Sequence, residues 1–148
     1  MFHFRLQRVL DYRQRRVEQL ENAAQQLQHR LQQEAARLEA LQAESRQQQA
    51  YLAGMATVRG EDLHMWRRYY HGLEAQIAQQ QGVVQEATQL LTSKQQELVT
   101  ARQEAKMLAD MADKAQQHYL CTLARQEQQL LDEIAIARAC HGHSTDTA

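Results

Sequence analysis

Residues 52–63 read LAGMATVRGEDL and contain two of the five glycines of the chain, Gly54 and Gly60. A regular apolar repeat stops at this segment, and a second repeat begins at Leu63. Glu61 and Asp62 follow the second glycine, and acidic side chains favour the first turn of a helix. The segment therefore predicts a short turn between two helices.

The chain before the turn carries one continuous heptad repeat. Steps of four and three residues from Leu6 reach fifteen positions, of which eleven are apolar, without a skip. A repeat sustained over this length is typical of a coiled coil. The positions are Leu6, Leu10, Arg13, Val17, Leu20, Ala24, Leu27, Leu31, Glu34, Leu38, Leu41, Ser45, Gln48, Leu52 and Met55.

The chain after the turn carries a second repeat, in which only Gln80 and Lys94 are polar. Its positions are Leu63, Trp66, Tyr70, Leu73, Ile77, Gln80, Val84, Ala87, Leu91, Lys94, Leu98, Ala101, Ala105, Leu108, Ala112, Ala115 and Tyr119. Beyond Tyr119 the apolar positions advance by one residue, which is the effect of a stutter. They become Leu123, Leu130, Ile134 and Ala137.

These repeats predict an all-α fold, a long two-helix antiparallel coiled-coil hairpin. The 148 residues include no proline and are rich in strong helix formers. A short connection makes two helices antiparallel neighbours. We expect one hairpin over residues 1–140, with a first helix at about 3–54, a turn at about 55–60 and a second helix at about 61–139. Residues 141–148 are expected to form a flexible tail.

The two predicted helices differ in length, since the second has about 25 residues more than the first can cover at the standard helical rise. We therefore expect the segment from Asp113 to Cys140 to have an apolar stripe without an intramolecular partner. An uncovered apolar stripe usually marks a binding surface.

Composition argues against several classes of function. The net charge of -1 gives no basic footprint for nucleic acid. No apolar run is long enough for a transmembrane segment, and the start lacks the features of a secretory signal, which predicts a cytoplasmic protein. A coiled coil offers no concave pocket, so we expect no enzyme activity and no cofactor. Cys140, His141 and His143 offer three ligands where zinc needs four, and we expect no metal.

Two groups of side chains are candidate contacts for partner proteins. Trp66 and Tyr70 fall on the apolar seam and are expected to close the hairpin beside the turn, whereas Tyr69 falls off the seam. Tyr69 could anchor a partner or could simply pack. The other group is a cluster of arginines that forms either an ordinary solvated face or a docking surface for an acidic partner. It contains Arg5, Arg8, Arg13, Arg15 and Arg16.

The sequence resembles the FliJ family of the bacterial flagellar type III export apparatus. The resemblance rests on three motifs in order along most of the chain. They are Phe2-x-Phe4-x-Leu6-x-x-Val9-Leu10-x-x-Arg13, then Arg37-Leu38-x-x-Leu41, then Glu61-x-Leu63-x-x-Trp66-x-x-Tyr69-x-x-x-Leu73-Glu74-x-x-Ile77. The resemblance implies a protein at the flagellar base on the inner membrane, which couples the hexameric export ATPase to the cytoplasmic domain of the export gate and assists export chaperones.

The resemblance also implies a set of contact residues for the export gate. The export gate would bind Arg37, Leu41, Glu44, Gln48, Tyr69, Leu73, Gln76 and Gln80. Several family members carry aromatic residues at the positions of Glu44 and Gln48, so this chain departs from the family there. We further expect the ATPase to bind the surface that includes Arg13, Arg16, Leu123 and Leu130.

Two other functions are compatible with the same pattern. The stalk protein of a virulence type III secretion system shares the shape and the role, and the Phe2-x-Phe4 start favours the flagellar system. A self-associating coiled-coil scaffold is the second alternative, and it would form a tight dimer in light scattering, whereas the hairpin predicts a monomer or a weak dimer.

Overall fold

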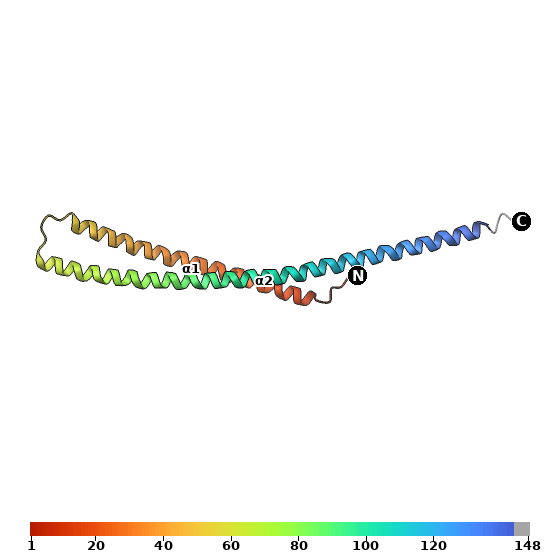
Figure 1. Ribbon diagram of the computed structural model, residues 1–148, viewed down its shortest axis with the longest axis horizontal. Coiled ribbons are helices and arrows are strands. Elements are labelled where there is room, and N and C mark those ends of the chain that lie inside the picture. Colours follow the sequence, from red (N-terminus) through yellow and green to blue (C-terminus); the bar gives the residue numbers. More distant parts are fainter. Residues whose placement is uncertain (144–148) are drawn as a thin grey trace. The chain divides into compact units, whose positions relative to one another are not determined.

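The computed structural model describes residues 1–143 and contains two helices, α1 (Gln7–Ala53) and α2 (Gly60–His143). They run antiparallel and are joined by a turn at residues 54–59 (Figure 1). No strand occurs within these described residues. The predicted all-α two-helix hairpin is therefore confirmed.

The first helix is shorter than the sequence predicted. Residues 1–4 have no regular structure, and the chain enters α1 through a turn in which the backbone amide of Gln7 donates to the carbonyl of Phe4 at 3.1 Å. At the other end, the amide of Gly54 still donates to Ala50, at 3.1 Å. The next amide, that of Met55, reaches back only three residues to Leu52, at 3.2 Å, so the helix tightens and ends there.

The second helix is longer than the sequence predicted. It begins at Gly60, with Glu61 and Asp62 in its first turn, and continues through His143, whereas we expected it to end near residue 139. No described glycine has the positive φ of a helix C-cap, and Gly142 continues the helix. Residues 144–148 of the expected tail lie outside the described residues.

The chain divides into two compact units. The turn unit comprises Arg16–Ala101, and the terminal unit comprises Met1–Arg15 together with the part of α2 from Arg102 onward. Each unit contains a piece of α1 and a piece of α2.

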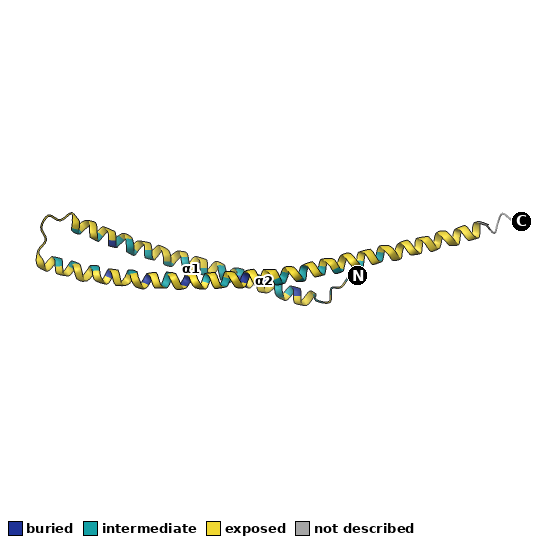
Figure 2. Cartoon of the chain, viewed as in Figure 1, coloured by how far each residue is buried: buried dark blue, intermediate teal, exposed yellow. Residues whose placement is uncertain are grey.

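The buried residues follow the predicted seam. In Figure 2 they are short, separate patches on helices whose other residues are half-buried or exposed. All eight occupy positions of the two heptad series: Leu10, Leu20, Ser45, Leu73, Gln80, Ala87, Leu98 and Ala101. In the turn unit, Leu20, Leu98 and Ala101 form one cluster, against which Val17 packs. Burial of a leucine contributes about 1.5–3 kcal/mol, so such layers hold the hairpin closed.

Two buried seam positions, Ser45 and Gln80, are polar. Gln80 is only 6% exposed, and its side-chain amide donates to the backbone carbonyl of Glu34 at 3.0 Å and to its carboxylate at 2.6 Å. Both bonds cross from α2 to α1 within the turn unit. A satisfied polar pair in an apolar seam favours one register over the others, because a shifted register would leave the amide unpaired.

In the terminal unit, the start of the chain covers more of α2 than we expected. The ring of Phe2 packs on Tyr119 with centroids 5.5 Å apart, and Leu123 is still half-buried. Residues before α1 are not helical, and an extended residue advances about 3.3 Å against about 1.5 Å in a helix. We predicted that the uncovered segment begins at Asp113, and this predicted start is therefore wrong. Described residues are uniformly exposed only from Ala124 onward.

Candidate functional site

The most exposed aromatic side chain at the start of α2, Tyr69, is held by a carboxylate of the opposite helix. Its ring is 50% exposed, yet its hydroxyl donates a hydrogen bond to Oε1 of Glu44. This hydrogen bond, aided by the nearby negative charge, raises the pKa of the Tyr69 phenol above its ordinary value of 10.0. Tyr69 thus presents an aromatic face to solvent in a fixed orientation.

The neighbouring aromatics, Trp66 and Tyr70, pack on each other along α2. Trp66 and Tyr70 stack with centroids 4.9 Å apart and an interplanar angle of 10°. The side-chain amide of Gln49 donates to the hydroxyl of Tyr70 across the hairpin. Because two polar residues of α1 hold two adjacent tyrosines of α2, the turn unit presents a preorganised aromatic surface.

The eight residues of the predicted gate surface differ in accessibility. Arg37, Gln76 and Tyr69 are exposed, whereas Leu41, Glu44 and Gln48 are half-buried. Leu73 and Gln80 are buried in the seam. The structure brings four of the eight together around one cavity of about 390 Å³, namely Arg37, Leu41, Gln76 and Gln80.

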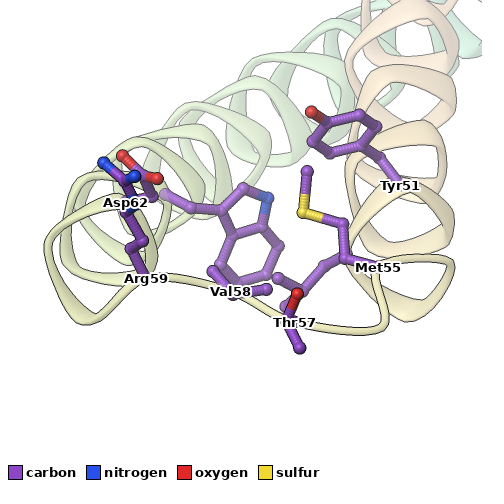
Figure 3. A pocket seen from close by; sticks show the side chains of 8 residues that line it. Tyr51, Met55, Thr57, Val58, Arg59 and Asp62 are labelled. Atoms are coloured by element: carbon purple, nitrogen blue, oxygen red, sulfur yellow. The ribbon is translucent and has the colours of Figure 1, made fainter.

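A second cavity lies at the turn itself and was missed by sequence reasoning. It has a volume of about 470 Å³ (Figure 3). Its lining comes from the end of α1, the turn and the start of α2, and consists of Tyr51, Leu52, Met55, Thr57, Val58, Arg59, Asp62 and Trp66. Apolar residues inside a short turn, Met55 and Val58, were the available sequence signal.

The candidate ATPase residues also differ in accessibility. In the terminal unit, Arg13 forms an ion pair with Glu104, and both side chains remain partly exposed. Leu123 is half-buried at the last covered position, whereas Leu130 is 59% exposed. Arg16 is exposed and belongs to the turn unit.

The part of α2 from Ala124 to Gly142 exposes its whole circumference. Four of its exposed residues are large and apolar, namely Leu130, Leu131, Ile134 and Ile136. The rest of this segment is exposed as well (Figure 2). Leu130 and Ile134 lie one helical turn apart and share a face. A helix with such a face, uncovered by any other described residue, has the surface expected of a docking element.

Among residues 1–143, no group of three or more histidine, cysteine, aspartate and glutamate side chains is placed to hold a metal ion. Within the same residues, neither helix contains an apolar stretch long enough to cross a membrane. Cys121 and Cys140 are both exposed thiols.

The two antiparallel helices and their heptad seam define the class of coiled-coil hairpin proteins. A family model described as flagellar FliJ protein matches residues 2–144, nearly the whole chain. The chain therefore belongs to the FliJ family, whose members are components of the flagellar export apparatus. Neither a curated protein nor a solved structure matches the chain significantly.

Proposed function

We propose that this FliJ-family protein couples the hexameric flagellar export ATPase to the cytoplasmic domain of the membrane export gate. It would act in the cytoplasm, bound peripherally at the flagellar base. The observation that supports the proposal is that each unit has an exposed surface of different chemistry, aromatic around Tyr69 in the turn unit and apolar around Leu130 in the terminal unit. A protein with two unlike docking surfaces can hold two different partners at once.

The gate would bind the turn unit around Tyr69. Exposed, rigid aromatic side chains commonly anchor protein interfaces, and the hydrogen bond to Glu44 removes part of the entropy cost of ordering this ring. Arg37 and Gln76 supply exposed polar contacts from the same predicted surface. Leu73 and Gln80 are buried, so they would support this surface from beneath.

The ATPase would bind the terminal unit through the uncovered part of α2. Leu130 and Ile134 form an apolar face that a partner could cover, and removal of this surface from water would drive association. The exposed arginines Arg5, Arg8 and Arg15 near the start of the chain add positive charge to the same unit. They would favour an acidic counterpart and a salt-dependent association rate.

Chaperone handling is the third part of the proposal. Met107 and Met111 lie one turn apart on α2, and both are at least half exposed. Methionine side chains adapt to different partner shapes, which suits the recognition of several chaperones. Replacing both by glutamine should weaken chaperone binding and leave the helix intact, because glutamine is also a strong helix former.

Two matched variants of the full chain test the two main contacts separately. Tyr69→Ala should lower the affinity for the gate domain by about tenfold or more and leave ATPase affinity unchanged. The double variant Leu130→Gln, Ile134→Gln should lower the affinity for the ATPase and leave the affinity for the gate domain unchanged. If either variant lowers the affinity for both partners equally, or for neither partner, the assignment of one surface to each partner is wrong.

A further inference from the structure

The seam that closes the hairpin continues into the uncovered end of α2. Leu123 is the last seam residue that other described residues cover, and the same heptad steps lead on to Leu130 and Ile134, which are 59% and 49% exposed. Where the seam is covered, an antiparallel helix covers it, as Leu20 of α1 covers Leu98 of α2 in the turn unit. The end of α2 therefore presents the kind of face that an antiparallel helix covers elsewhere in the chain.

The spacing of the uncovered seam is symmetric about Asp132. Two residues before it lies Leu130, and two residues after it lies Ile134. Five residues before it lies Glu127, and five residues after it lies Ala137. When two copies of such a segment run antiparallel, each position meets the position equally far on the other side of the centre. Leu130 then meets the partner's Ile134, and this contact occurs twice.

The charges on one flank of the seam complement each other in the same arrangement. Arg138 follows Ala137, so it lies beside the partner's Glu127 when Ala137 meets that residue. Both Glu127 and Arg138 are exposed, and neither forms an ion pair among residues 1–143. A parallel, in-register pair would instead place Glu127 against the partner's Glu127 within the seam, where like charges repel. The charges thus favour the antiparallel orientation.

The covered surface is small, and one contact opposes it. On the other flank, Glu133 lies next to the centre of symmetry and comes near the partner's Glu133, and like charges repel. The apolar residues that each copy would cover are few, namely Leu130, Leu131, Ile134 and Ala137. We expect a dissociation constant on the order of 100 μM, because so small a surface barely exceeds the cost of association. In dilute solution the end of α2 is therefore exposed.

We propose that the uncovered end of α2 pairs with the same segment of a second copy in an antiparallel, symmetric dimer. Leu130 and Ile134 form its core, and Glu127 with the partner's Arg138 forms the ion pair at its edge. The pairing itself does not depend on the proposed function. One consequence rests on it, because Leu130 and Ile134 are also the residues assigned to the ATPase, so that self-pairing and ATPase binding exclude each other.

Sedimentation equilibrium of the full chain between about 10 μM and about 1 mM tests the pairing. The average mass should rise from 17.2 kDa towards twice that value. The double variant Leu130→Gln, Ile134→Gln should stay at 17.2 kDa. The matched control is Leu90→Gln with Val99→Gln, a pair of similarly exposed apolar residues in the turn unit, which should dimerise like the parent chain. A constant mass in the parent chain, or an unchanged dimer in the Leu130 and Ile134 variant, would overturn the proposal. The measurement contains no ATPase, so its result is independent of the ATPase assignment.

Three charge variants test the orientation in the same experiment. Arg138→Glu should weaken the dimer about fivefold, since it replaces two attractions by two repulsions, and adding Glu127→Arg should restore it. Glu133→Gln should strengthen the dimer about twofold, because it removes the repulsion near the centre. In a parallel pair, Glu133 would lie beside the partner's Arg138, and the same variant would weaken the dimer. A weaker dimer in Glu133→Gln, or no recovery in the charge swap, contradicts the antiparallel pairing.

Discussion

The hydroxyl of Tyr69 on α2 donates its hydrogen bond to the carboxylate of Glu44 on α1. Glu44 is half-buried, whereas the ring that it orients is half exposed. The exposed aromatic side chain is therefore supplied by α2, and α1 supports it. This relationship has a measurable consequence in the titration of Tyr69.

The pKa of Tyr69 should depend on Glu44. The hydrogen bond favours the neutral phenol, so its contribution to stability is complete below the ordinary tyrosine pKa of 10.0 and is lost as pH rises through the raised value. Glu44→Ala should lower the Tyr69 pKa, and Glu44→Gln should lower it less, because the amide oxygen still accepts. NMR of ¹³C-labelled tyrosine rings measures the titration. Glu39→Ala is the control and should have no effect, and an unchanged pKa in Glu44→Ala would contradict the account.

The two leucines Leu98 and Leu130 should respond very differently to truncation. Leu98 is buried with Leu20 and Ala101, so Leu98→Ala should reduce the free energy of unfolding by about 2–4 kcal/mol. Leu130 is exposed, so Leu130→Ala should change it by less than about 0.5 kcal/mol. Chemical denaturation followed by circular dichroism compares them. Similar losses would mean that the end of α2 is covered in solution.

Gly82→Ala should stabilise the hairpin. Gly82 lies inside α2, and a Cβ at this position would meet no described atom within 4 Å apart from its chain neighbours and the adjacent backbone of the same helix. Alanine restricts the unfolded chain and favours helix, which should raise the free energy of unfolding by about 0.5–1 kcal/mol. A thermal melt measures the gain. Destabilisation would contradict the open environment described for this position.

The ion pair of Arg13 with Glu104 should contribute little to stability. The two side chains are 40% and 44% exposed, so solvent screens their attraction. A double-mutant cycle with alanine at both positions should give a coupling free energy below about 1 kcal/mol, decreasing as salt is added. A larger, salt-independent coupling would show that the pair is buried in solution.

The heptad pattern predicted the seam closely, because burial on a hairpin depends mainly on the period of the apolar residues. Even the polar positions Ser45 and Gln80 were assigned to the seam, where they are buried. The pattern could not predict where Phe2 reaches, since that depends on an extended backbone before α1. It also placed the end of α2 too early, because Gly142 adopts an ordinary helical conformation.

The details of the candidate surfaces were less accessible to sequence reasoning. The off-seam position of Tyr69 predicted its exposure correctly. Its bond to Glu44 depends on where two off-seam residues of different helices meet, which a one-dimensional repeat does not specify. The unpaired nitrogen of Trp66 depends likewise on the geometry of its stack with Tyr70.

The most direct test of coupling is whether one chain holds both partners at once. The gate cytoplasmic domain is immobilised, the export ATPase is added, and the ATPase retained is measured with and without this protein. The account predicts that the ATPase is retained only with the intact chain, and is lost with either Tyr69→Ala or the Leu130→Gln, Ile134→Gln double variant. If the ATPase instead displaces the chain from the gate domain, the two partners compete for one surface, and coupling is contradicted.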